Sequence, residues 1–128
     1  MAEDTTDKEL NRRGGMVSSA DFREYVIRKD IPRMKELFRD RDWEQIDKVL
    51  GHERGFIIDP FNPLNLMPFS YDLSIGDEAF SCRLESRGSF ALRDEKNAYK
   101  MEPGETVIVR TLEYIALPRC YSATVWPR

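Results

Sequence analysis

The chain has 128 residues and a formal net charge of −3, and 41% of its residues are hydrophobic while 34% are charged. This length supports one modest hydrophobic core, and the composition is typical of a globular protein with a heavily charged surface. The 20 basic and 23 acidic residues are mixed along the chain, so the charge balance gives no reason to expect nucleic acid as a partner. No apolar run approaches the length that spans a membrane.

The two cysteines, Cys82 and Cys120, lie far apart in the sequence. The first residues do not have the pattern of a signal peptide, so nothing points to an oxidising compartment. We therefore expect a cytoplasmic protein with two reduced, half-buried thiols. A disulfide between the two is the less favoured alternative.

The chain begins with polar and then helical patterns. Residues 1–17 are polar and highly charged, and we expect them to form a disordered tail. Residues 18–51 carry apolar side chains at helical spacing, which predicts two or three short amphipathic helices. We expect their stripe of apolar residues to pack in a core rather than to bind a partner. The start and stop signals of these helices are Ser18, Pro32, Asp40 or Asp42, and Gly51.

Residues 55–78 combine a proline-rich arm with an alternating segment. A short apolar strand opens the arm, and three prolines follow, which exclude helix and suit a central strand poorly. Residues 70–75 then alternate polar and apolar side chains, which predicts a strand with Asp72 in the middle of its polar face. Gly76 and Asp77 are expected to end this strand in a turn. The pattern indicates a rigid arm that delivers a carboxylate.

The rest of the chain has the period of β-strands. Short strands separated by turns predict an all-β sandwich or barrel after the helices, and hence an α+β chain that is mainly β. The helical segment 18–51 is thus followed by a β domain over residues 52–128. Because the last expected strand ends with the chain, Trp126 has no cover, and we expect the β domain to be incomplete at its C-terminus. The further strands are expected at 79–86, 90–92, 106–111, 114–117 and 121–126, with a turn at Pro103-Gly104.

Several kinds of catalytic site do not fit this sequence. Zinc-dependent deamination needs histidine and cysteine ligands in H-x-E and P-C-x-x-C patterns, whereas the chain has one histidine, His52, and no C-x-x-C. This excludes a protein-ligated zinc site, and His52 is expected at the surface. No serine stands in a nucleophile elbow, and the seven glycines are scattered rather than gathered in a phosphate-binding loop.

Three segments carry a family resemblance. The first is Asp59-Pro60-Phe61-Asn62, followed by Ser70-Tyr71-Asp72-Leu73-Ser74-Ile75-Gly76-Asp77-Glu78. The second is Pro103-Gly104-Glu105, followed by Thr111-Leu112-Glu113-Tyr114-Ile115-Ala116-Leu117-Pro118. The third is Pro127-Arg128. In this order and spacing they resemble the dCTP deaminase family, which is related to the trimeric dUTPases, and Pro127-Arg128 is similar to the start of its Arg-Ser-Ser phosphate-binding motif.

The resemblance implies a nucleotide-metabolism protein that deaminates dCTP hydrolytically to dUTP, or onward to dUMP, on a partial jelly-roll or dUTPase-like β-barrel. It implies dCTP or another deoxynucleotide as ligand, Mg²⁺ bound with the triphosphate, and a homotrimer with active sites between subunits. Arg128 matches the arginine that opens the phosphate motif, and Asp72 resembles an aspartate that lies near the metal–triphosphate in related dUTPases. The family's catalytic glutamate region falls beyond Arg128, so we assign no catalytic residue and leave open whether the chain is an enzyme.

Each of these residues also has a structural interpretation. An aspartate between two serines is commonly solvated or bonded to a turn, and an arginine at a chain end is commonly solvated. Glu113 could be mistaken for a catalytic base, but the family pattern places it in a structural strand. Two other functions stay open: a non-catalytic binding or assembly module that uses the segment 18–51, and a dUTPase-like pyrophosphatase with Asp72 near the metal.

Overall fold

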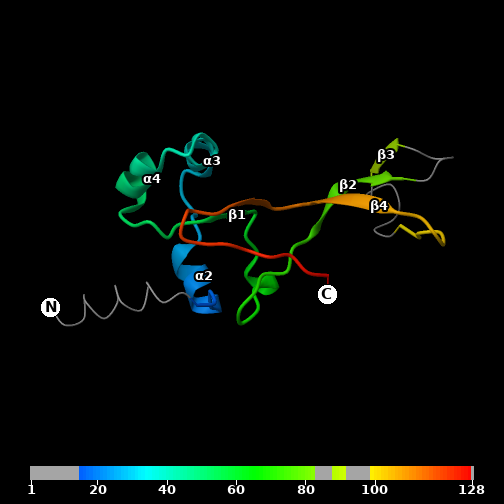
Figure 1. The fold of residues 1–128 in the computed structure, drawn as a ribbon, viewed down its shortest axis with the longest axis horizontal. Coiled ribbons are helices and arrows are strands. Elements are labelled where there is room, and N and C mark those ends of the chain that lie inside the picture. Colours follow the sequence, from blue (N-terminus) through cyan, green and yellow to red (C-terminus); the bar gives the residue numbers. More distant parts are fainter. Residues whose placement is uncertain (1–14, 83–87, 92–98, 128) are drawn as a thin grey trace.

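The computed structural model describes residues 15–82, 88–91 and 99–127. Within these ranges, three α-helices precede five short strands, which form a two-stranded and a three-stranded antiparallel sheet. Figure 1 shows the helices at one end of the molecule and the three-stranded sheet at the other. The predicted α+β class is confirmed. The described strands form two separate sheets rather than a closed barrel, so the jelly-roll barrel stays a prediction.

The three helices are α2 (Ser19–Tyr25), α3 (Ile31–Asp40) and α4 (Trp43–Leu50), in agreement with the two or three predicted. Their ends follow the expected capping chemistry. Ser18 and Asp21 form a capping box at the start of α2, and the Asp42 side chain accepts a hydrogen bond from the backbone N–H of Gln45 at the start of α4. Gly51 ends α4 with a φ of 73°, a left-handed conformation that glycine adopts at little cost.

The hydrophobic core lies between the helices and the two-stranded sheet. This sheet pairs β1 (Ile57–Asp59) with β5 (Tyr114–Ala116), and Ile57 is fully buried beneath α3 and α4. A second cluster packs Val26 and Phe56 against α2 and the aromatic side chains around it. Both clusters confirm that the apolar stripes of the helices are core packing. The buried members of the larger cluster are Ile27, Met34, Phe38, Ile46 and Ile57.

The three-stranded sheet has the order β3-β2-β4, with strands β2 (Ile75–Ser81), β3 (Gly88–Ala91) and β4 (Val107–Thr111). A register shift between Ile75 and Ala79 interrupts the pairing of β2 with β4. Gly76 lies in this shift, where an added Cβ would stand 2.9 Å from the carbonyl oxygen of Arg110. Large apolar side chains on β2 and β4, among them Ile75, Phe80, Ile108 and Val109, are exposed.

Two predicted strands are wrong. Residues 70–74 do not form a strand, because their backbone groups bond to single partners instead of a neighbouring ladder, and Gly76-Asp77 lies inside β2 instead of ending a strand. Residues 121–127 also form no strand, although they alternate in sequence. Alternating side chains form a strand only where the edge of a neighbouring strand offers backbone hydrogen-bond partners. Trp126, which the alternation would place in such a strand, is 76% exposed. The strand predicted at 79–86 agrees with β2 over residues 79–81, and its part at 83–86 lies outside the described residues, as do residues 1–14 of the predicted tail. A turn was expected at 87–89, but Gly88 and Ser89 belong to β3.

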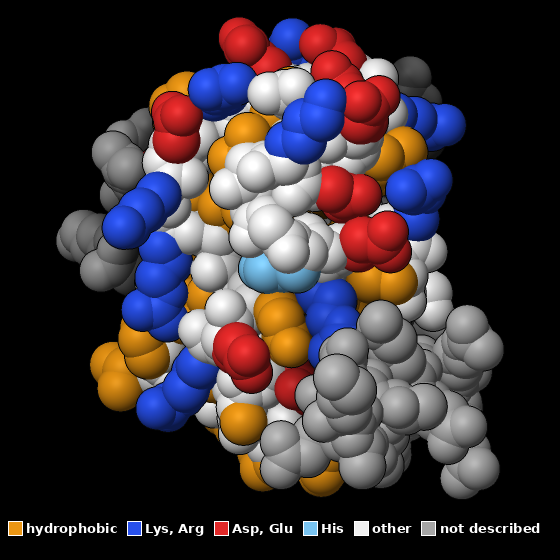
Figure 2. Space-filling view, turned by 90° about the vertical axis from the view of Figure 1, so that its left-hand side faces the viewer, with side chains coloured by type: hydrophobic (Ala, Val, Ile, Leu, Met, Phe, Trp, Pro, Cys, Tyr) orange, Lys and Arg blue, Asp and Glu red, His pale blue; other side chains and the backbone are white. Residues whose placement is uncertain are grey.

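The surface of the helical end carries mixed charges. Figure 2 shows lysine, arginine, aspartate and glutamate side chains interspersed on this face, with the histidine near its centre. His52 is exposed, as predicted.

Both thiols are free, as expected, but Cys82 and Cys120 are exposed, so the prediction of half-buried thiols is wrong. In the described part of the chain no helix has the length and apolar character needed to cross a bilayer.

Candidate functional site

The proline-rich arm positions Asp72 by aromatic packing and backbone bonds. The Tyr71 ring stacks on Phe61 with centroids 5.4 Å apart and lies 6.4 Å from Phe22 of α2. Its hydroxyl accepts a hydrogen bond of 2.9 Å from the backbone N–H of Asn62. The backbone N–H of Ser19 donates to the carbonyl of Pro68 over 2.8 Å. The arm is therefore held from two sides, by its own turn and by the start of α2.

Asp72 follows directly and is half-buried. Its backbone N–H donates to the carbonyl oxygen of Asn65 over 2.9 Å. Asn65 ends the short 3₁₀ helix η1 (Pro63–Asn65), so the prediction that the prolines exclude helix from the arm is wrong for this one turn, where proline suits the first helical position. The Asn65 side-chain amide reaches the Ser74 hydroxyl over 3.3 Å. The segment around Asp72 is thus a bonded loop rather than a strand, and its backbone is fixed although it lies outside both sheets.

Glu113 connects the loop around Asp72 to the β-sheets by hydrogen bonds. It is 6% exposed, and both its carboxylate oxygens accept a hydrogen bond from the backbone N–H of Ser74 at 3.0 Å. The carbonyl of Ser74 in turn accepts from the backbone N–H of Leu112 over 2.9 Å. The buried carboxylate therefore ties the entrance of β2 to the junction of β4 and β5. These contacts are structural, but Glu113 lies in the bend between β4 and β5, so its predicted position in a strand is wrong.

The structure does not bring the two predicted site residues together, because Arg128 lies outside the described residues. Asp72 is described, but its predicted position near a metal stays a prediction. Over residues 15–82, 88–91 and 99–127, no three histidine, cysteine or acidic side chains gather in a group that could hold a metal ion. A Mg²⁺ ion that arrives with a triphosphate needs only one or two protein carboxylates, so a single aspartate fits such an ion.

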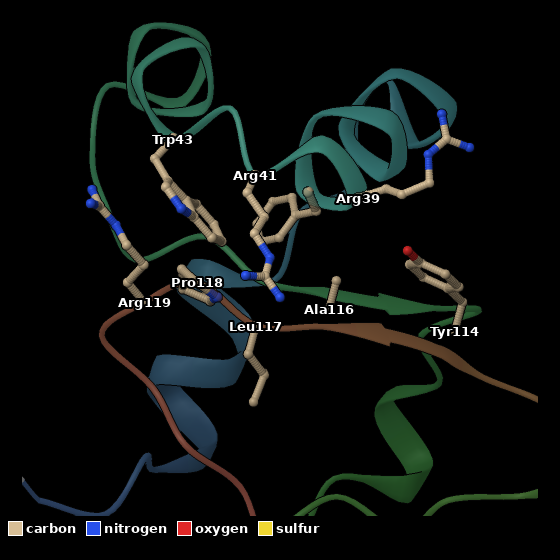
Figure 3. A pocket seen from close by; sticks show the side chains of 9 residues that line it. Arg39, Arg41, Trp43, Tyr114, Ala116, Leu117, Pro118 and Arg119 are labelled. Atoms are coloured by element: carbon tan, nitrogen blue, oxygen red, sulfur yellow. The ribbon is translucent and has the colours of Figure 1, made fainter.

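A cleft that the sequence did not reveal lies on the opposite side of the two-stranded sheet from α2 (Figure 3). It has a volume of about 370 Å³ and lies between α3, the start of α4 and the chain that follows β5. Three arginines line it, and Trp43 and Tyr114 contribute aromatic walls. Arg39 and Arg41 stand close in sequence, but only the folded chain brings Arg119 to them. The lining residues are Phe38, Arg39, Arg41, Trp43, Tyr114, Ala116, Leu117, Pro118 and Arg119.

Burial perturbs two titratable groups near the end of the described chain. Packing against Phe56, with ring centroids 5.8 Å apart, accompanies the partial burial of Tyr121. Burial raises the pKa of the Tyr121 phenol to about 12. Cys120 is exposed as a residue, but partial desolvation of its thiol raises the pKa of that group. The Cys120 thiol donates a hydrogen bond of 3.3 Å to the carbonyl of Glu53. Both groups are therefore held in their neutral forms at neutral pH.

The comparisons with known proteins give one match. A family model described as dCTP deaminase-like matches residues 42–128, which is more than half of the chain. The match begins at the N-cap of α4 and covers the arm, both sheets and Glu113. A search of curated proteins and a search of solved structures each return no match. On the strength of the family match, this chain belongs to the dCTP deaminase-like family of nucleotide metabolism.

Proposed function

We propose that this protein acts in pyrimidine deoxynucleotide metabolism by hydrolytic deamination of dCTP. In this reaction water adds to C4 of the cytosine ring and ammonia leaves, which gives dUTP. Hydrolysis of dUTP by a second water, with pyrophosphate as the leaving group, would carry the product on to dUMP. The observation that carries the proposal is the dCTP deaminase-like match over residues 42–128. It includes the arm, the loop around Asp72 and the Pro127-Arg128 pair that resembles the start of the phosphate motif.

In this proposal Arg128 binds a phosphate of the nucleotide, since guanidinium groups form strong charge-assisted bonds with phosphate oxygens. Asp72 lies near the Mg²⁺ that accompanies the triphosphate, and the fixed backbone of its loop supports this role. When bound, Mg²⁺ neutralises charge on the triphosphate. No residue of the chain is assigned as the base that activates water, because the family resemblance places the catalytic glutamate beyond Arg128. Glu113 is not proposed for this role, since both its carboxylate oxygens accept from the backbone N–H of Ser74.

The proposed assembly is a homotrimer of the dUTPase-like jelly-roll type. The apolar side chains exposed on the three-stranded sheet support association, because patches of this kind commonly mark interfaces. The same observation favours a second candidate function, that of a non-catalytic assembly module. A dUTPase-like pyrophosphatase is the third candidate, and there Asp72 would carry the metal-dependent step.

The test is a titration of the full chain with dCTP and Mg²⁺, together with an assay of ammonia release. Arg128→Gln is expected to weaken dCTP binding about tenfold, the effect of losing one hydrogen bond to a charged group. Asp72→Asn is expected to weaken binding only when Mg²⁺ is present. Asp30→Asn is the matched control, because Asp30 is exposed at the N-cap of α3 and its side chain makes no capping bond.

The outcomes separate the three candidate functions. Release of ammonia from dCTP supports the deaminase, whereas release of pyrophosphate from dUTP without ammonia from dCTP identifies the pyrophosphatase. Self-association with no binding of either nucleotide would leave only the assembly module. Unchanged dCTP binding in both Arg128→Gln and Asp72→Asn would overturn the proposed site.

A further inference from the structure

The arginine-lined cleft is chemically unlike the rest of the molecule. The whole chain has a formal net charge of −3, whereas the residues that line the cleft include three arginines and no aspartate or glutamate. Of the carboxylates close to it in sequence, Asp42 accepts a hydrogen bond from the Gln45 backbone, whereas Asp40 lies 3.6 Å from Arg39 and offsets the charge of that arginine. The positive charge of the cleft is therefore that of Arg41 and Arg119. The cleft is therefore a local positive site on an acidic protein, and such a site attracts anions.

Arg41 is placed in the cleft by an unusual backbone conformation. It follows α3 with φ 55° and ψ 36°, in the left-handed region where glycine or asparagine would fit at lower cost. Figure 3 shows its side chain extending from the turn between α3 and α4 toward Leu117 and Pro118. No ion pair is recorded for Arg41 within the described ranges. An uncommon conformation that aims an uncompensated cation into a cleft is a reason to look for a ligand.

Arg119 supplies the second guanidinium group. Its guanidinium carbon lies 5.4 Å from the centroid of the Trp43 ring, a cation–π arrangement that fixes the charge beside the cleft. In the view of Figure 3, Pro118 lies between the Arg119 and Arg41 guanidinium groups, while Arg39 points away. The Arg41 guanidinium group extends into the cleft and suits an anion with several oxygen atoms, since its planar fork can form two parallel hydrogen bonds. The Arg119 guanidinium group lies against the outer side of Trp43 and adds positive charge at the rim.

The walls of the cleft add an apolar component. Phe38 and Pro118 are buried, and Trp43 and Tyr114 present ring surfaces. The volume of about 370 Å³ lies in the range of pockets that take small organic ligands. We propose that this cleft is a binding site for a small organic phosphate, with the phosphoryl group on Arg41, the charge of Arg119 at the rim and a flat apolar group against the walls. The site is separate from Asp72, so it does not rest on the proposed nucleotide function.

Phenyl phosphate is the test ligand, titrated into the full chain at low ionic strength. Trp43 fluorescence reports binding once the second tryptophan is removed by Trp126→Phe, which changes an exposed residue outside the cleft. Inorganic phosphate tests the contribution of the walls, and benzoate, with the same ring and a single carboxylate, tests the phosphoryl group. Phenyl phosphate is expected to bind more tightly than either, and equal affinity for all three would overturn the assignment of an organic phosphate.

Arg41→Gln is expected to lower the affinity for phenyl phosphate about tenfold or more, the effect of losing a charge-assisted hydrogen bond. Arg119→Gln removes a charge at the rim and is expected to lower the affinity less than Arg41→Gln. Both residues are exposed, so we expect each variant to unfold at the wild-type temperature. An unchanged unfolding temperature then shows that a loss of affinity is not caused by misfolding. Arg33→Gln removes the same charge from an exposed position on α3 outside the cleft and is the matched control. An equal loss in Arg33→Gln would mean general charge attraction and would overturn the site, as would unchanged affinity in Arg41→Gln. Arg128 belongs to the proposed nucleotide site and does not line the cleft, so a tenfold loss of affinity in Arg128→Gln would mean that phenyl phosphate binds at that site and would overturn the cleft site.

Discussion

Removal of the Glu113 carboxylate is expected to destabilise the protein because it leaves a backbone donor without its partner. Both oxygens of Glu113 accept from the N–H of Ser74 at 3.0 Å, and the side chain is 6% exposed. A hydrogen bond to a charged group contributes about 1.5–3 kcal/mol, and a buried unsatisfied group costs a similar amount. We therefore expect Glu113→Ala to lower the free energy of unfolding by about 2–3 kcal/mol. Glu113→Gln keeps one acceptor oxygen and should lose about 1 kcal/mol.

The assay is urea and thermal unfolding followed by circular dichroism. A chain of this size loses roughly 4 °C in unfolding temperature for each kcal/mol, so Glu113→Ala should unfold about 8–12 °C lower. Glu36→Ala is the control, because Glu36 is exposed on α3 and surface changes of this kind stay within about 0.5 kcal/mol. Amide exchange adds a local readout: the N–H of Ser74 should lose protection in Glu113→Ala.

The opposite result would refute the structural role of this carboxylate. If Glu113→Ala unfolds within about 0.5 kcal/mol of Glu36→Ala and the Ser74 amide stays protected, the bond is not a structural tie. A catalytic base would behave differently, since Glu113→Gln would then abolish turnover of dCTP while leaving stability unchanged. A greater loss of stability in Glu113→Ala than in Glu113→Gln therefore identifies the carboxylate as a structural tie rather than a catalytic base.

Three further predictions concern the core, the sheet and the alkaline range. Met34→Ala should cost about 2–5 kcal/mol in urea unfolding, because Met34 is 1% exposed; a loss below 1 kcal/mol would contradict the packing of α3. Gly76→Ala should cost about 1–3 kcal/mol in the same assay, because its Cβ would stand 2.9 Å from the Arg110 carbonyl; wild-type stability would contradict the close approach of β2 and β4. The pKa of Tyr121 should be about 12, above its ordinary value of 10.0. The measurement is an ultraviolet titration of the wild type from which the titration of Tyr121→Phe is subtracted. Since its folded pKa is raised, its contribution to stability is present below pH 10.0 and is lost as pH rises through about 12; ionisation near 10.0 would refute its burial.

The helices could be predicted from sequence because their signals are local. Ser18 with Asp21, and Gly51 at the end of α4, act within a few residues of their own position, and the structure uses them as expected. The segment 70–74 was predicted wrongly for the opposite reason. Its alternation suits a strand, but the backbone of Asp72 bonds to Asn65 and that of Ser74 to a glutamate far along the chain. No local pattern contains those partners.

The candidate sites divide in the same way. The sequence singled out Asp72 because a motif surrounds it, but it gave no indication that the Arg41 and Arg119 side chains would line one cleft. Arg41 and Arg119 are 78 residues apart in the sequence, and no motif singled out either of them. Both residues line the cleft because α3 packs against the two-stranded sheet. The buried side chains of Met34 and Phe38 hold α3 in that position. Tertiary packing of this kind cannot be predicted from the spacing of residues along the sequence.

The position of α2 and α3 also changes how the function should be tested. Both helices precede the family match, which begins at residue 42, yet Ile27, Met34 and Phe38 cover the fully buried Ile57 within it. A deletion of residues 18–40 would uncover that core and withdraw Phe22 from the arm, so a lost interaction would report unfolding rather than a lost binding surface. Point substitutions avoid this ambiguity. The exposed arginine Arg41 can be changed without touching the core, and so a partner or ligand of the helical segment is better sought with such variants than with truncations.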